Sequence, residues 1–135
     1  MIQIENVSFR YGKRAGVFDG LSLSMDSGHI YGLLGRNGAG KTTLLKIMTG
    51  MLFPKSGTCQ VFGLESRRRE PAMLSDMLFV PEEFYAPEGT IQRYVDLYAP
   101  LYPAFDHKQF AAYLDELQLR KNDLFRALSL GQKKK

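Results

Sequence analysis

The sequence predicts an α/β fold that combines an antiparallel β part, an α/β core and a helical part. Three observations predict it. Apolar and polar residues alternate near the N-terminus, an uninterrupted apolar run at 30–34 leads into a glycine-rich loop, and helical spacing dominates beyond residue 90. The 135 residues suffice for one modest domain, and 44% hydrophobic with 24% charged residues is the composition of an ordinary folded protein.

The first elements are expected to be half-buried antiparallel strands. Apolar residues alternate with polar ones over residues 2–9, and residues 21–25 repeat with a strict period of two. A further alternating strand is expected at 58–62, where Cys59 fits as a small packed hydrophobe. A single cysteine excludes an internal disulfide and fits a reducing compartment.

Two other apolar runs lack alternation. Residues 30–34 and 77–80 are continuous apolar stretches bounded by turn residues, which predicts strands buried on both faces, as in a parallel sheet. Pro81 is expected to end the second of them, because proline cannot donate to a sheet ladder. Residues 43–51 have helical spacing with Gly50 as the stop, and the apolar side is expected to hold Leu44, Leu45, Ile47 and Met48.

The remainder of the sequence predicts helices. Thr90 is an N-cap candidate for a helix with apolar residues at the i, i+3, i+4, i+7 positions, namely Ile91, Tyr94, Val95 and Tyr98. Pro100 and Pro103 break this pattern. Asp106 is the next N-cap candidate, and Phe105 and Phe110 are placed to form a hydrophobic staple across it.

A phosphate-binding loop (P-loop) is the most specific motif. It matches G-x-x-x-x-G-K-[ST] at every fixed position with Gly35, Arg36, Asn37, Gly38, Ala39, Gly40, Lys41 and Thr42. Its glycines let successive N–H groups point into one concavity, and a helix that begins near Lys41 adds its positive dipole end. We expect the Lys41 ammonium to reach the β- and γ-phosphates of ATP and the Thr42 hydroxyl to bind Mg²⁺.

The residues around this loop resemble one P-loop family. Residues 32–46, with the lead-in Phe9-Arg10-Tyr11-Gly12, resemble the Walker A region of ATP-binding cassette (ABC) ATPases, and residues 127–132 look like their LSGGQ signature with Leu130 in place of the first glycine. The resemblance covers essentially the whole chain. It implies a P-loop NTPase core with an antiparallel β subdomain and a helical subdomain, incomplete at the C-terminal end. Residues 1–88 would hold the β subdomain and the core, and residues 89–135 the helical subdomain up to the signature.

The resemblance also implies roles for individual residues. Tyr11 would stack on adenine, which its flat aromatic face suits. The nucleotide would contact the P-loop and Thr43, and the γ-phosphate of ATP held by a partner subunit would contact Ser129, Gly131 and Gln132. Glu82 falls where the family has its Q-loop glutamine, so Lys41 and Glu82 are the implied catalytic residues and Thr42 and Glu82 the implied Mg²⁺ ligands. A carboxylate can bind Mg²⁺, but it adds negative charge beside the triphosphate.

The family pattern continues past the signature into the Walker B aspartate, a catalytic glutamate and a switch histidine. This sequence stops at Lys135, and both of its histidines, His29 and His107, lie before the signature. We therefore expect the 135 residues alone to bind nucleotide weakly and to hydrolyse it negligibly. We also expect exposed apolar surface, because core strands that flank the P-loop strand in the family are absent from the sequence.

The resulting hypothesis is an ATP-binding subunit of an ABC transporter, using ATP and Mg²⁺ and coupling hydrolysis to transport. Its partners would be a membrane permease and a second nucleotide-binding subunit, and it would be cytoplasmic, on the inner face of the membrane. No apolar stretch reaches the length of a membrane span. The alternatives are a soluble ABC ATPase of the translation or DNA-repair type and a non-catalytic ATP-binding fragment. Nucleic-acid binding is not expected, since the net charge of +4 comes mostly from residues 67–69 and 133–135.

Overall fold

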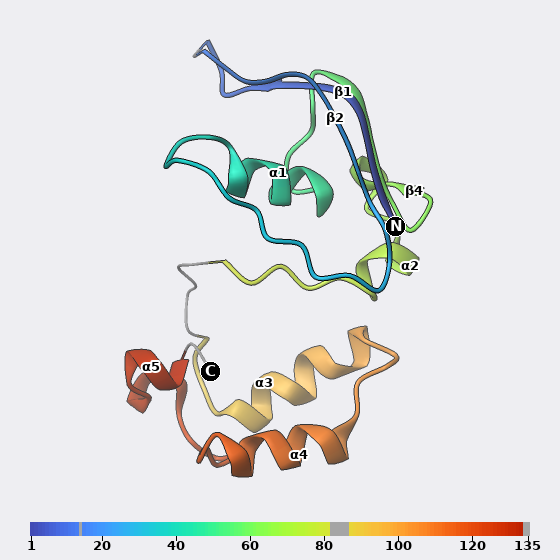
Figure 1. Ribbon diagram of the computed structural model, residues 1–135. Helices are drawn as coiled ribbons and strands as arrows, with labels where there is room; N and C mark the ends of the chain where they lie inside the picture. The colour runs from blue at the N-terminus through green and yellow to red at the C-terminus, as the bar shows by residue number, and fades with distance from the viewer. Residues whose placement is uncertain (14, 82–86, 134–135) are drawn as a thin grey trace. The chain divides into compact units, whose positions relative to one another are not determined.

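The computed structural model describes residues 1–13, 15–81 and 87–133, with only the backbone described for Leu130. The chain forms two compact units, Met1–Phe79 and Val80–Lys135 (Figure 1). The division of functional subdomains at residue 88 stays a prediction. Among the described residues, no helix has both the length and the apolar character needed to span a bilayer.

The first unit is built on an antiparallel sheet with the strand order β2-β1-β3-β4. Its strands are β1 (Ile2–Arg10), β2 (Gly16–Met25), β3 (Ser56–Val61) and β4 (Leu64–Glu65). β1 lies in the middle and pairs antiparallel with both β2 and β3. The alternating segments near 2–9, 21–25 and 58–62 are therefore strands, as predicted, because each presents one apolar face to the core.

An irregularity in β1 explains the one break in its alternation. Ile4 and Val7 are both buried although they are three residues apart. The register shifts between Ile4 and Val7 against β2 and between Glu5 and Ser8 against β3. Asn6 takes a left-handed conformation with φ 50°. An extra residue in one strand turns the following side chain back to the same face, so Val7 joins Ile4 in the core.

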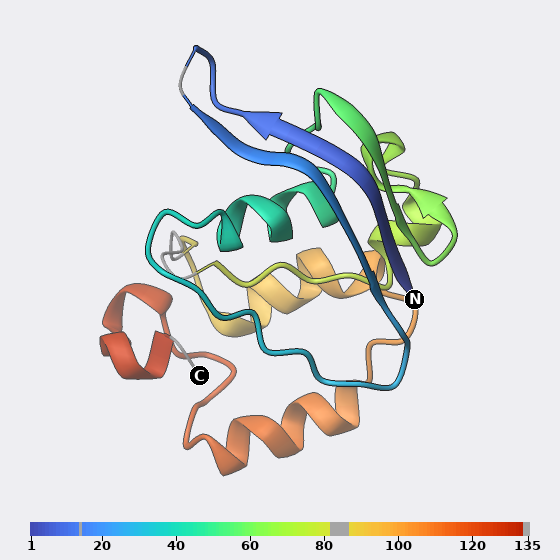
Figure 2. The same ribbon diagram turned by 45° about the horizontal axis from the view of Figure 1, so that its top comes forward.

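Helix α1 (Lys41–Met48) packs against one face of this sheet, as both ribbon views show (Figures 1 and 2). Leu44, Ile47 and Met48 are buried together with Ile4, Val7, Phe9, Cys59, Val61 and Met73. The prediction that Leu45 shares this face is wrong, since its side chain is 42% exposed. At about 100° per residue, the three buried side chains fall within one sector of about 100° around the helix, and Leu45 lies outside that sector.

The C-terminal end of α1 has its free carbonyls satisfied by two devices. Gly50 follows the helix with φ 68°, its N–H donates to the Ile47 carbonyl, and the Met51 N–H donates to Lys46. This is the Schellman pattern expected at a glycine stop. Arg69 adds hydrogen bonds of 3.2 Å from Nη1 to the carbonyls of Thr49 and Gly50. The arginine follows the 3₁₀ helix η1 (Ser66–Arg68) and precedes α2 (Pro71–Leu74).

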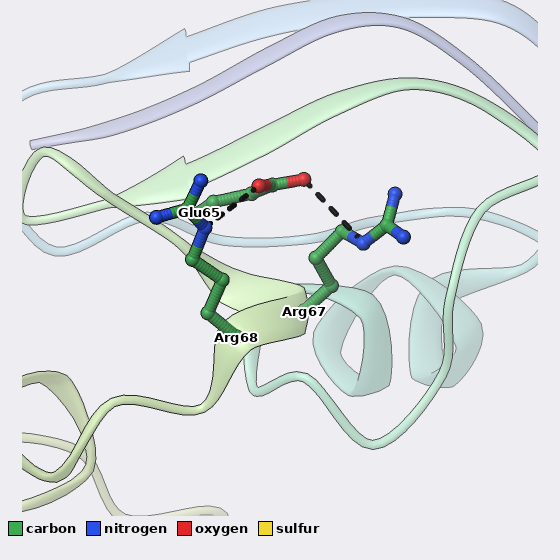
Figure 3. A network of polar contacts seen from close by, with 3 residues as sticks. All are labelled: Glu65, Arg67 and Arg68. Atoms are coloured by element: carbon green, nitrogen blue, oxygen red, sulfur yellow. Dashed lines mark hydrogen bonds and ion pairs between the residues drawn. The ribbon is translucent and has the colours of Figure 1, made fainter.

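The other two arginines of this basic run share one carboxylate. Glu65 lies between Arg67 and Arg68, with Nε to oxygen distances of 3.6 Å and 3.3 Å (Figure 3). Both arginine side chains are about two thirds exposed, at 66% and 69%, so these pairs stabilise the fold little. All three arginines of the run thus contact groups of this chain.

The two strands predicted from continuous apolar runs are not formed. No described residue pairs with 30–34 or 77–80, and Figure 2 draws the chain between β2 and α1 as a coil. Ile30 is 103% exposed and Leu34 93%, while Leu78 and Val80 are each 74% exposed. An apolar run becomes a buried strand only when neighbours supply hydrogen bonds and cover both faces. The expected exposed apolar surface is therefore observed at these segments.

The second unit is helical. Its helices are α3 (Ile91–Tyr98), η2 (Ala99–Leu101), α4 (His107–Glu116), η3 (Phe125–Ala127) and α5 (Leu130–Lys133). Thr90 caps α3 by accepting from the Arg93 N–H, and Asp106 caps α4 by accepting from two N–H groups. The predicted staple is present, with the Phe105 and Phe110 ring centroids 5.7 Å apart. The core of this unit is formed by Ile91, Leu119 and Leu128, with Phe110, Leu114, Leu117 and Phe125 packed against them.

Candidate nucleotide-binding site

The glycine-rich loop wraps tightly before α1. The Ala39 N–H donates to the Arg36 carbonyl at 3.1 Å, and Gly38 and Gly40 take left-handed conformations with φ 83° and 95°. A Cβ atom built on Gly40 would lie 2.6 Å from Val17 Cγ1 and 2.8 Å from two ring atoms of Phe18. Gly40 is therefore required twice, for its backbone angle and because β2 approaches it closely.

The Lys41 ammonium is held inside the bend of this loop. Its Nζ donates to the carbonyl of Gly35 at 2.8 Å and to that of Arg36 at 2.9 Å. An ammonium group has three N–H donors, so two of them fix its position and one remains for a ligand. The ammonium keeps its full positive charge, because the carbonyl oxygens that accept its hydrogen bonds carry no net negative charge. A positive point charge is thus fixed within the loop.

The N-terminus of α1 lies next to this charge. Gly40 occupies the N-cap position and, having no side chain, caps none of the first-turn N–H groups. Such groups lack intrahelical partners and carry the positive end of the helix dipole. Thr42 is exposed in this first turn, and its hydroxyl oxygen is a hard donor of the kind that Mg²⁺ prefers. The loop, Lys41 and the helix end together suit an anionic, magnesium-bearing ligand such as a nucleoside triphosphate.

Tyr11 is brought to the same region by β1. It follows the last residue of that strand, and its hydroxyl lies 3.0 Å from Thr43 Oγ1 in the first turn of α1. The Phe9 ring meets the Tyr11 ring edge to face with a centroid distance of 4.9 Å. Tyr11 is 42% exposed, so part of its ring surface is open to a ligand. The structure therefore places this aromatic residue next to the loop although 24 positions separate it from Gly35.

The residues that resemble a signature form a reciprocal cap in the second unit. The Gln132 N–H donates to Ser129 Oγ at 3.1 Å, and the Ser129 N–H donates to Gln132 Oε1 at 2.9 Å. This is a capping box at the start of α5. Leu128 anchors the segment, since it is buried in the core of the unit. Ser129 and Gly131 are exposed beyond that anchor.

The predicted site residues are thus distributed over both units. Tyr11, residues 35–42 and Thr43 lie together in the first unit, and Ser129, Gly131 and Gln132 lie together in the second. Glu82, the predicted catalytic residue and Mg²⁺ ligand, lies outside the described residues.

Sequence reasoning missed the residues that support the loop from β2. Val17 and Phe18 lie against Gly40, yet they precede it by more than 20 positions and belong to no motif. Their only signal is the pairing of β1 with β2, in which Phe18 lies opposite Phe9. That register brings β2 and the Phe9–Tyr11 segment to the same end of the sheet, and it is known only from the structure.

Comparison with known proteins agrees with this geometry. The family model described as "ABC transporter" matches residues 18–135. The chain is 33% identical over 120 residues to the ABC transporter ATP-binding protein YtrB of Bacillus subtilis, covering 87% of this chain and 40% of that protein. It is 33% identical to the putative ABC transporter ATP-binding protein AlbC of the same organism, covering 100% of this chain and 60% of that protein. The chain therefore spans about half the length of these relatives.

A solved structure has the same fold. The ATP-binding subunit of an ABC transporter superimposes with a TM-score of 0.84 at 24% identity, covering 98% of this chain and 57% of that one. The match by sequence thus points to one family, and the match by fold agrees with it. The chain belongs to the ABC transporter family, and it has the α/β fold of part of a P-loop NTPase domain.

Proposed function

We propose that this chain is part of the ATP-binding subunit of an ABC transporter and that it binds MgATP at residues 35–43. The observation that carries the proposal is the position of Lys41. Its ammonium is fixed by two loop carbonyls beside the uncapped N-terminus of α1, so one N–H donor and several backbone N–H groups are available to the same anion. Convergence of these groups favours a polyphosphate over a single carboxylate.

Each part of the site has a separate task in this proposal. The N–H groups of residues 35–42, other than that of Ala39, which donates to the Arg36 carbonyl, cradle the phosphates. Lys41 binds the β- and γ-phosphate oxygens. Tyr11 offers its ring face to the adenine base. Thr42 and Glu82 are the proposed ligands of Mg²⁺, which when bound neutralises part of the phosphate charge.

The second unit supplies the proposed contact across a dimer. Ser129, Gly131 and Gln132 lie at the start of α5, and the Ser129 hydroxyl is already oriented by its bond to the Gln132 N–H. We propose that this segment meets the γ-phosphate of ATP bound to a second nucleotide-binding subunit. ATP would then hold two subunits together, and hydrolysis by the whole protein would release them.

A membrane permease is the proposed downstream partner, with the subunit on the cytoplasmic face of the membrane. The support is that the relatives YtrB and AlbC carry the description of transporter ATP-binding proteins. This favours a transporter over a soluble ABC ATPase, whose motifs would be the same.

The test of the site is ATP binding by the whole protein that carries this sequence, measured by titration calorimetry with Mg²⁺ present. Lys41→Ala is expected to abolish binding, because it removes the fixed charge. Lys46→Ala is the matched control, since Lys46 lies on the same helix in its last turn. Unchanged affinity in Lys41→Ala, or equal losses in both variants, would contradict the proposal.

The role of Tyr11 is tested separately. Tyr11→Ala is expected to weaken ATP binding and to leave the binding of inorganic triphosphate unchanged, because only ATP has a base to stack. If the unmodified protein binds inorganic triphosphate as tightly as ATP, the ring makes no contribution and the assignment of Tyr11 is wrong.

A further inference from the structure

A single hydrogen bond links the proposed base platform to the helix that follows the phosphate loop. The Tyr11 hydroxyl lies 3.0 Å from Thr43 Oγ1, and the two residues are 32 positions apart. Thr43 is 6% exposed and lies in the first turn of α1, whereas Tyr11 is 42% exposed just beyond the end of β1. One partner is thus a fixed point of the core and the other lies at the surface.

The anchor is rigid for two reasons. A β-branched threonine in a helix has restricted rotation about χ1, and burial restricts it further. Neighbouring residues of α1 are held in the main core, where Leu44 is 4% exposed and Ile47 fully buried. The Thr43 hydroxyl is therefore placed by the fold before any ligand arrives.

The Tyr11 ring is consequently held at two places. Phe9 contacts it at a centroid distance of 4.9 Å with an interplanar angle of 89°, and Thr43 holds its hydroxyl end. Without the hydroxyl contact, a side chain at a strand end would exchange between rotamers. Binding to such a side chain costs the entropy of ordering it, and a ring that is already ordered avoids this cost.

We propose that Thr43 is a positioning residue for base recognition, whose hydroxyl holds the Tyr11 ring in the orientation that receives the adenine. This inference rests on the proposed role of Tyr11 as the base platform. It assigns the tyrosine hydroxyl a function of its own, so phenylalanine is not equivalent at position 11. When Tyr11 donates to Thr43, the threonine proton remains free to donate to a phosphate oxygen, so both roles of Thr43 are compatible.

The experiment compares ATP with inorganic triphosphate, both with Mg²⁺, by calorimetry on the whole protein. The ratio of the two affinities measures the contribution of the base. Tyr11→Phe is expected to lower this ratio about twofold to tenfold, the range for one neutral hydrogen bond, while triphosphate affinity stays unchanged. Thr43→Ser keeps the hydroxyl and is expected to keep the ratio, whereas Thr43→Val is expected to lower it.

The double variant Tyr11→Phe/Thr43→Val decides whether the two residues act through each other. Its ratio is expected to be no lower than that of either single variant, because both remove the same bond. An unchanged ratio in Tyr11→Phe, equal losses for ATP and triphosphate, or additive losses in the double variant would overturn the inference. If the unmodified protein binds ATP well and Tyr11→Phe matches it, only this inference fails. If the unmodified protein does not bind ATP, the proposed function itself fails.

Discussion

Substituting Gly40 by alanine tests the close approach of β2 to the phosphate loop. Two costs add at this position. Gly40 has φ 95°, and placing an L-residue in a left-handed conformation costs about 1–2 kcal/mol. The new Cβ would also lie 2.6 Å from Val17 Cγ1 and 2.8 Å from the Phe18 ring, so these side chains must move. Overpacking of this kind costs about 1–3 kcal/mol more, which gives about 2–5 kcal/mol in all.

Gly38 provides the matched control. It has a similar backbone angle, φ 83°, but a Cβ built on it meets no heavy atom within 4 Å. Gly38→Ala therefore carries the backbone cost without the steric cost, and it is expected to destabilise the protein by about 1–2 kcal/mol. The difference between the two variants isolates the contact between β2 and the loop.

The assay is urea unfolding without nucleotide, because a ligand that binds the folded state would add its own stabilisation. Midpoint shifts at constant m give the change in the free energy of unfolding. Gly40→Ala is expected to lose at least about 1 kcal/mol more than Gly38→Ala, the smallest steric cost that overpacking brings. Equal losses in the two variants would refute the packing of Val17 and Phe18 against Gly40.

Three further predictions concern the fold of the two units. Asp106→Ala removes the acceptor for the N–H groups of Lys108 and Gln109 and is expected to lower the free energy of unfolding by about 1 kcal/mol. Asp106→Asn is expected to retain most of the stabilisation by the cap, because asparagine is also a good N-cap residue. Equal unfolding midpoints for the two variants would contradict the role of Asp106 as a cap. Arg69→Ala is expected to cost about 1 kcal/mol by the same assay, because two carbonyls at the end of α1 lose a charged donor. Arg68→Ala, which breaks only an exposed pair, should cost less than about 0.5 kcal/mol, and the reverse order would be inconsistent with this assignment. Burial raises the pKa of the Cys59 thiol above its usual value, with a hydrogen bond from Ser66 opposing the shift, so the folded chain holds less thiolate than an unfolded one at any given pH. Labelling of Cys59 by a thiol reagent at pH 8 is therefore expected to follow unfolding, and rapid labelling of the folded protein would show that the thiol is accessible.

The motifs that lie within a few consecutive residues were determined by the sequence alone. The eight positions of the P-loop, the Thr90 and Asp106 caps and the Gly50 stop are found in the structure where the pattern places them. Each depends on hydrogen bonds between residues close in the chain, so the spacing of residue types carries the necessary information. The alternating strands were predictable for the same reason, since one apolar face requires a period of two.

Strand formation at 30–34 and 77–80 could not be decided this way. An apolar run indicates that a segment is suited to burial, but a strand forms only when other segments pair with it. Among the described residues no such partner is present, and side chains such as Ile30 and Leu34 are exposed. The sequence pattern indicates a tendency to be buried, but whether the segment forms a strand depends on neighbouring strands that pair with it.

The tertiary structure alone decided which distant residues meet at the loop. Tyr11 contacts Thr43 across 32 positions, and Val17 and Phe18 lie against Gly40. These contacts follow from the register of β1 on β2 and from the packing of α1 on the sheet. Both arrangements are stabilised by the burial of many apolar side chains spread over the unit, each of which contributes a small part of the free energy. The sequence thus determined that a glycine-rich loop with the P-loop pattern precedes α1, and that Lys41 follows it. Only the fold determined which side chains support that loop, because contacts between distant residues are set by how whole elements pack and leave no local pattern in the chain.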